Sequence, residues 1–212
     1  MMACTSPLTA HRSSNGQIVF GSGPLRLACG QCMGCRLERS RQWAIRCVHE
    51  SKFHVHNCFL TLTYDDVHIP DNHNLCYRDF QLFMKKLRRQ FSGKLIRFYM
   101  CGEYGENTHR PHYHACIFGI DFDDKVPFHR SSSNSVLYRS DLLDKLWSMG
   151  HASIGELTFE SAAYTSRYIT KKLIGSDDKS GNNFVNIDTG EVFERVPEFT
   201  RMSLKPGIGR PF

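Results

Sequence analysis

The stretch IRFYMCGEYGENTHRPHYHACIFGI, residues 96–120, indicates two β-strands joined by a polar loop. Ile96–Tyr104 and His112–Ile120 are rich in aromatic and β-branched residues, whereas Gly105–Pro111 between them is polar. Such runs are typical of strands, and a short connection favours antiparallel pairing. We therefore expect these two segments to pair in an antiparallel sheet.

Outward from this pair, strands and helices alternate irregularly along the chain. Asn57–Tyr64 and His151–Thr158 predict further strands, residues 184–196 indicate a hairpin, and residues 1–28 and 197–212 show little periodicity. Four segments repeat apolar residues at the spacing of a helix: residues 36–52, 78–91, 140–149 and 160–174. Because the elements do not repeat as βαβ units, the pattern predicts an α+β fold with a mostly antiparallel sheet.

The composition is that of an ordinary globular protein. Of the 212 residues, 41% are hydrophobic and 23% charged, with 27 Lys and Arg against 21 Asp and Glu. These values exclude collagen, a coiled coil and wholesale disorder. No apolar run has the length of a membrane span or a signal peptide, so we expect a cytosolic protein without a membrane partner. We expect one folded unit, with residues 1–56 as an N-terminal arm and residues 57–212 as the core.

His112 and His114 are the sharpest candidates for chemistry. Side chains alternate faces along a strand, so two histidines separated by one residue project from the same side and can share a cation. Glu103, at the end of the preceding strand, adds a carboxylate across an antiparallel pair, and such a set suits a divalent ion that also holds a phosphate. The same spacing occurs at His54 and His56, and surface imidazoles without a metal are the simpler alternative.

Tyr164 and Tyr168 are one helical turn apart, so their phenols share a face of the predicted helix, near Arg167, Lys171 and Lys172. Tyrosines at this spacing are usually packing residues. Beside a metal that polarises a phosphodiester, and a cation that favours phenolate, they permit covalent attack on DNA. The two residues are therefore candidate nucleophiles.

Three cysteines, Cys29, Cys32 and Cys35, form a second candidate metal site in the sequence. In a reducing compartment, clustered thiols are more often metal ligands than disulfides. We expect a structural Zn²⁺ ahead of an iron–sulfur cluster, with Cys47 or His49 as the fourth ligand. The alternative is three reduced, merely buried cysteines.

Two predicted helices carry clusters of positive charge. A run of charges on a helix is usually a solvated face, but beside a nuclease site it would neutralise DNA phosphates without reading sequence. The candidate DNA contacts are Arg36, Arg39, Arg41 and Arg46 on the first helix, and Lys85, Lys86, Arg88 and Arg89 on the second.

Several segments together resemble the HUH endonucleases that initiate rolling-circle replication, whose name describes two histidines around a hydrophobic residue. The chain is most similar to the gokushovirus-type replication initiation proteins of the Microviridae. The HUH resemblance rests on four segments in the family's order: FLTLTY (59–64), GEYG (102–105), RPHYHACIFG (110–119) and YTSRYITKK (164–172). The gokushovirus resemblance adds CGQCMGCRLERSRQWAIRC (29–47), NCFLTLTYDD (57–66) and MSLKPGIG (202–209).

The resemblance implies a central antiparallel sheet of about five strands with flanking helices, related in topology to RNA-recognition motifs. It also implies that His112 and His114 bind Mg²⁺ or Mn²⁺ and that Glu103 is the third ligand. The implied partner is single-stranded or melted origin DNA, and the implied location is the cytoplasm of a host bacterium. Relatives continue with a basic C-terminal portion, so we expect a short or truncated member.

The resemblance further implies that Tyr164 and Tyr168 nick and rejoin the origin in alternation. Each attack leaves a 5′-phosphotyrosine and a 3′-OH that primes a host polymerase. Lys171 matches the lysine of the family's motif, and Lys172 beside it is the alternative for that role.

Three other hypotheses stay open from the sequence. They are a transposase or relaxase with the same chemistry, a metallohydrolase without a covalent intermediate, and a non-catalytic zinc-containing nucleic-acid-binding protein centred on Cys29–Cys35. The sequence has no GxxxxGK[ST] motif, so we expect a host helicase to unwind the origin.

Overall fold

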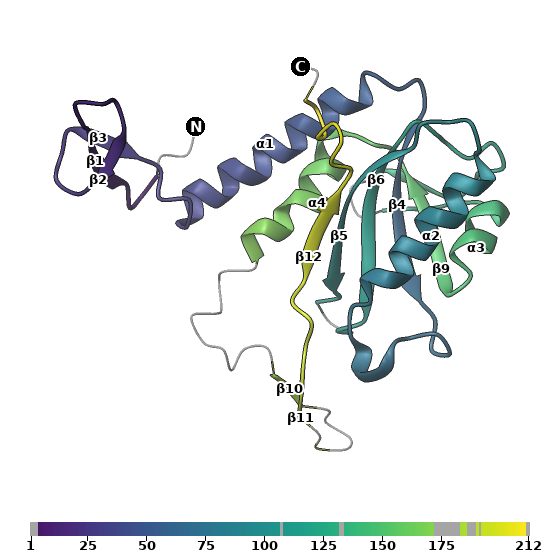
Figure 1. The fold of residues 1–212 in the computed structure, drawn as a ribbon. Helices are drawn as coiled ribbons and strands as arrows, with labels where there is room; N and C mark the ends of the chain where they lie inside the picture. The colour runs from purple at the N-terminus through teal and green to yellow at the C-terminus, as the bar shows by residue number, and fades with distance from the viewer. Residues whose placement is uncertain are drawn as a thin grey trace.

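The computed structural model describes residues 4–106, 108–131, 134–171, 183–185, 190 and 192–210, and it has the predicted α+β architecture. Its centre is a seven-stranded sheet with the order β12-β5-β6-β4-β9-β8-β7, in which every described pairing is antiparallel (Figure 1). The strands are β4 (Asn57–Tyr64), β5 (Arg97–Tyr104), β6 (Pro111–Phe118), β7 (Val126–Arg130), β8 (Val136–Arg139), β9 (Gly150–Gly155) and β12 (Phe199–Met202).

Two helices cover each face of this sheet. Helices α2 (Tyr77–Gln90) and α3 (Asp141–Trp147) lie on one side, and α1 (Met33–Ser51) and α4 (Phe159–Lys171) lie on the other (Figure 1). The order β4-α2-β5-β6-α3-β9 along the chain gives the spatial order β5-β6-β4-β9, a β-α-β-β-α-β unit. A short 3₁₀ helix, Asp71–His73, precedes α2.

Alternation along the strands divides the core into two layers. Tyr113, Ala115 and Ile117 of β6 pack in the layer under α2 and α3. Cys116 and Phe118 pack in the layer under α1 and α4. Since side chains alternate on a strand, His112 and His114 face the α1 and α4 side. The sheet therefore separates these histidines from α2.

The central sheet has seven strands, so the expectation of about five was too low. Strands β7 and β8 form a hairpin and β12 pairs with β5, although residues 197–212 showed no period. Every residue of β7 is exposed, so it carries no apolar alternation that a sequence pattern could reveal. Strand β12 has four residues, which is too short for a clear period.

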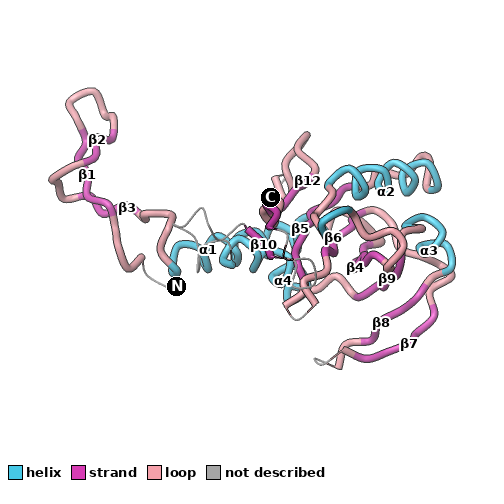
Figure 2. The backbone as a smooth tube through the Cα atoms, turned by 90° about the horizontal axis from the view of Figure 1, so that it is seen from below, coloured by secondary structure: helices cyan, strands magenta, loops and turns pink. Residues whose placement is uncertain are grey.

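The first 28 residues form a separate three-stranded sheet, which we call the small sheet. It consists of β1 (Leu8–Arg12), β2 (Ile18–Phe20) and β3 (Leu25–Leu27) in the order β2-β1-β3. It lies beyond the N-terminal end of α1, away from the seven-stranded sheet (Figures 1 and 2). Strands β10 (Asn183–Val185) and β11 (Val192–Glu194) form the expected hairpin. The division into residues 1–56 and 57–212 stays a prediction.

A buried ion pair joins α1, β5 and the C-terminal segment. Glu50 and Arg97 form this pair with side chains 4% and 7% exposed. The second carboxylate oxygen of Glu50 accepts from Gly209 N at 2.7 Å, and Arg97 donates to Pro206 O at 2.7 Å. Arg46 donates to Ile208 O at 2.8 Å. These bonds hold residues 206–209 against the sheet. Among the described helices, none is long and apolar enough to cross a membrane.

Candidate active site

Glu103, His112 and His114 meet on the face of the sheet that α1 and α4 cover. The β5–β6 register sets Glu103 opposite His112 and Cys101 opposite His114. The Nε2 atoms of both histidines lie 3.1 Å from Glu103 Oε1. The candidate ligand atoms lie within 4.8 Å of one another, and no other set of His, Asp and Glu in the described part of the chain meets this criterion.

The surroundings orient both rings so that Nε2 is the free lone pair. His112 Nδ1 lies 3.1 Å from Arg110 O, a carbonyl that only accepts, so Nδ1 carries the proton. His114 Nδ1 lies 3.0 Å from the hydroxyl of Thr61, and its ring stacks on Phe59 with centroids 5.6 Å apart. In neutral rings, two nitrogen lone pairs and a carboxylate oxygen then converge, which is the donor set of a divalent cation.

Tyr164 is the residue of α4 that reaches this cluster. Its hydroxyl donates to Glu103 Oε1 at 3.0 Å, and its ring meets His114 edge-on with centroids 4.9 Å apart. The side chain is 43% exposed, so the cluster opens to solvent beside it. Tyr168 and Lys171 belong to the last turn of α4, but their side chains and all of Lys172 lie outside the described residues.

Charge and burial act in opposite directions on Glu103. Burial raises the pKa of this carboxyl, but the hydrogen bonds and charges of His112 and His114 outweigh burial and hold the pKa well below its usual range. Burial raises the pKa of Tyr164 well above its usual value, and the charge of Glu103 adds to the effect. In this arrangement Glu103 is ionised and Tyr164 is a neutral phenol at pH 7.

Thr61 supplies a test of the metal centre, because it contacts His114 without being a candidate ligand. We expect Thr61→Val to weaken Mn²⁺ binding by about 10–100-fold, the usual cost of losing a group that orients a ligating histidine. Titration of Mn²⁺ by calorimetry measures the change. Thr63→Val is the matched control, because Thr63 lies on the same face of β4 opposite His112 and makes no hydrogen bond to either ring among the described contacts. Equal losses in both variants would contradict the assignment.

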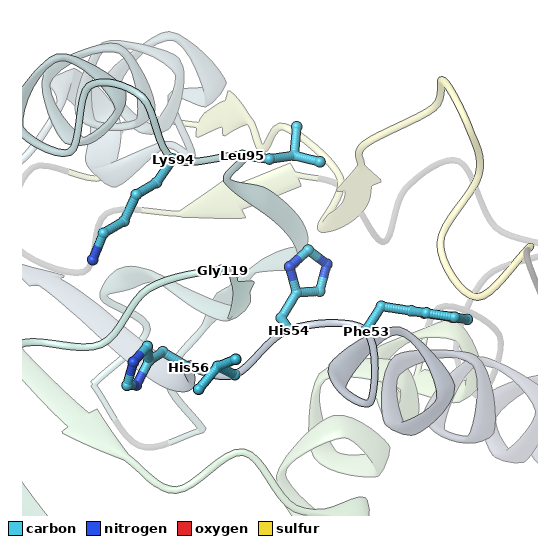
Figure 3. Close-up of a pocket in the computed structure, with 7 residues that line it drawn as sticks. Phe53, His54, His56, Lys94, Leu95 and Gly119 are labelled. Carbon is cyan, nitrogen blue, oxygen red and sulfur yellow. The ribbon is translucent and has the colours of Figure 1, made fainter.

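The alternative pair His54 and His56 lies in a loop at the other end of the sheet. It forms part of a shallow pocket with Phe53, Lys94 and Leu95, where the two imidazoles point apart (Figure 3). His54 lies 3.4 Å from Glu50 and contacts Phe118, so it belongs to the buried ion-pair region. The residue between the two histidines, Val55, is 92% exposed and extends no strand.

The cysteine cluster also differs from the prediction in its fourth member. Cys29, Cys32 and Cys35 come together, but the fourth thiol is Cys4 and not Cys47 or His49. Cys47 lies 12 residues after Cys35 on one continuous helix, roughly 18 Å along its axis, and is buried between α1 and the sheet. Sequence spacing missed Cys4 because the small sheet, 24 residues of chain between Cys4 and Cys29, brings the two together.

The two basic clusters lie on opposite faces of the sheet. The cluster of α2 is exposed but lies across the sheet from Glu103, so it does not border the candidate site as expected. Arg39 and Arg41 are exposed on α1, which packs along α4 on the face of the site. Arg36 is half-buried beside the cysteines. Arg46 is tied to the C-terminal segment and lies over Trp43, which is a structural role.

The fold and the histidine cluster together fit a replication-associated protein, and comparison with known sequences gives the particular family. The family model described as replication-associated protein of the ORF2 type matches residues 57–173. The chain belongs to this family.

Three relatives found by comparison are phage proteins. The chain is 35% identical to replication-associated protein VP4 of Bdellovibrio phage phiMH2K, over 84% of this chain and 61% of that protein. It is 34% identical to replication-associated protein ORF2 of Spiroplasma virus 4, over 98% and 68%, and 35% identical to ORF4 of Chlamydia phage 1, over 70% and 39%. The chain thus spans between 39% and 68% of the length of these relatives. No solved structure matches the chain.

Proposed function

We propose that the chain is a metal-dependent nickase that initiates rolling-circle replication by tyrosine attack on single-stranded or melted origin DNA. One observation carries the proposal: the hydroxyl of Tyr164 lies 3.0 Å from Glu103, the carboxylate that His112 and His114 also contact. A nucleophile next to a divalent-cation donor set is what phosphodiester transfer requires. Membership in a family of replication-associated proteins supports DNA as the substrate.

The residues present fit a divalent cation, because their donor atoms are nitrogen and carboxylate oxygen without sulfur. Mg²⁺ or Mn²⁺ held by Glu103, His112 and His114 would supply charge to polarise the scissile phosphate. Fixed rings keep both Nε2 atoms aimed at one point, so the site is organised before DNA binds. Thr61 and Arg110 do this orienting.

Tyr164 performs the covalent step in this proposal. Its oxygen attacks phosphorus, the bond from phosphorus to the 3′ oxygen breaks, and the released strand ends in a 3′-OH. The phenolic proton passes to solvent, because Glu103 stays ionised and Tyr164 is partly exposed. The product is a 5′-phosphotyrosine, and attack by a 3′-OH on it rejoins the strand and restores the phenol.

The second tyrosine and the lysine of α4 complete the proposed machinery. Tyr168 follows Tyr164 by one turn of α4, so it is placed to cleave the regenerated origin while Tyr164 holds the old end. Lys171, or Lys172 after it, would stabilise charge on the phosphate. Exposed Arg39 and Arg41 of α1 would contact the DNA backbone on the face of the site. A host helicase and a host polymerase would unwind and extend the origin.

The direct test is a search for a covalent protein–DNA adduct. The full chain is incubated with 3′-labelled single-stranded oligonucleotides that tile the genome encoding it, with Mn²⁺ or with EDTA, and resolved on a denaturing gel. We expect a slowly migrating labelled band for the oligonucleotides that carry the origin, present with Mn²⁺ and absent with EDTA. Mass spectrometry of the digested band should place the nucleotide on a peptide of α4.

Two other results would overturn the proposal in different ways. Cleavage that leaves a free 5′-phosphate without an adduct would indicate a metallohydrolase that uses water. Binding of origin DNA with neither cleavage nor adduct would indicate a non-catalytic nucleic-acid-binding protein.

A further inference from the structure

We propose that Cys4, Cys29, Cys32 and Cys35 form a structural Zn²⁺ site that closes the small sheet and fixes it to α1. All four are free thiols, half-buried, with sulfur atoms within 4.8 Å of one another. They share no residue with the Glu103 cluster, so the inference does not depend on the proposed nuclease reaction.

The distances between the sulfurs match a tetrahedral zinc site. Zinc bound about 2.3 Å from each of four sulfurs sets neighbouring sulfurs about 3.8 Å apart. The Cys4 and Cys32 sulfurs are 3.7 Å apart, and those of Cys29 and Cys35 are 3.9 Å apart. A disulfide needs about 2.05 Å, so these pairs have the spacing of ligands around an ion and not of bridges.

The backbone around the cluster is arranged to receive thiolates. Cys29 Sγ accepts N–H groups of Gln31 at 3.4 Å and Cys32 at 3.2 Å, and Cys4 Sγ accepts the N–H of Cys29 at 3.4 Å. Gly30, with φ +74°, makes the turn that aims these groups. Thiolate is the form of cysteine that binds zinc, and N–H donors stabilise its negative charge.

Positive charge beside the cluster offsets the charge of four thiolates and one Zn²⁺. Cys32 is the N-cap of α1 and Cys35 lies in its first turn, where the helix dipole favours anions. A side chain built at Gly30 would meet the guanidinium of Arg39 at 3.9 Å, so this group lies over the loop. The Nε of Arg36, next to Cys35, is buried without a hydrogen-bond partner in the structure.

The small sheet needs such a tie because it has almost no core. Of its three strands only Ala10 is buried. A sheet of this size that buries so little apolar surface is not stable alone, and small domains of this kind commonly depend on metals. Cys4 precedes β1 and Cys29 follows β3, so one ion would join both ends of the small sheet to the start of α1.

The test measures the metal directly. The full chain, purified without a metal-affinity tag, is analysed for zinc, iron and acid-labile sulfide, and is then stripped and reconstituted with Co²⁺. We expect zinc in the wild type and, with Co²⁺, the strong visible and near-ultraviolet absorption of a tetrahedral thiolate complex. The Glu103 cluster contains no sulfur, so the thiolate charge-transfer band reports the cysteine site alone.

Two matched serine variants separate ligation from a general effect of losing a thiol. Cys4→Ser is expected to lose most of the thiolate band and of the bound zinc, whereas Cys76→Ser, at a half-buried cysteine outside the cluster, keeps both. Circular dichroism confirms that each variant keeps the main fold. Iron with sulfide in the wild type, no bound metal, or full zinc content in Cys4→Ser would each overturn the proposal.

Discussion

Replacing Tyr164 by phenylalanine is expected to remove the covalent adduct at that residue while leaving the metal centre in place. Phenylalanine keeps the ring that meets His114 edge-on and lacks only the hydroxyl that contacts Glu103. On an oligonucleotide with one origin site, we expect the rate of adduct formation to fall by at least about 10³-fold, a conservative figure for the loss of a catalytic nucleophile. Any residual adduct should map to Tyr168.

Two controls separate this chemical loss from a loss of folding or of metal. Mn²⁺ affinity should be unchanged in Tyr164→Phe, because the three candidate ligands remain. Tyr77→Phe makes the same atomic change on α2, across the sheet, and should leave the rate unaltered. An adduct of wild-type yield in Tyr164→Phe would refute the assignment of this residue as the nucleophile.

The largest effect on stability is expected at the buried ion pair. Arg97→Met removes the positive charge and leaves Glu50 buried with an uncompensated carboxylate. We expect a loss of about 3–5 kcal/mol in the free energy of unfolding, because breaking a buried pair exposes the full desolvation cost of the remaining charge. For a chain of this size that corresponds to a fall in Tm of roughly 6–20 °C. Thermal unfolding followed by circular dichroism measures it.

A second variant distinguishes the charge effect from lost packing. Adding Glu50→Gln to Arg97→Met removes the stranded charge and keeps an oxygen to accept from Gly209, so the double variant should be more stable than Arg97→Met alone. Arg41→Ala breaks the exposed pair with Glu38 and should change Tm little. A Tm for Arg97→Met close to that of Arg41→Ala would contradict the prediction.

The central part of the fold was predictable because its patterns are local. Strands β5 and β6 and helices α1 and α2 follow from runs of apolar residues with the period of their own structure. The site came from two such patterns, the spacing of His112 and His114 and that of Tyr164 and Tyr168. Their meeting at Glu103 depends on the register of β5 with β6 and on the path of α4, which no local pattern encodes.

The misses share a physical cause, because each depended on packing between distant segments. Cys4 joins the cysteine cluster only after the small sheet turns the chain back. The basic residues of α2 read like those of α1 in sequence, but the order of elements places the helices on opposite faces. Strand β12 is recognisable only once β5 offers it an edge.

The packing of α4 against α1 also has a mechanical meaning for the proposed reaction. A DNA strand joined to Tyr164 is anchored on α4, so any pull from a moving replication fork enters the protein through that helix. The neighbouring helix α1 is braced at its C-terminal end by the Glu50–Arg97 pair and continues at its N-terminal end into the cysteine cluster. Tension on the tethered strand would thus pass from α4 into a helix held at both ends, and the two histidines on the sheet would be shielded from it.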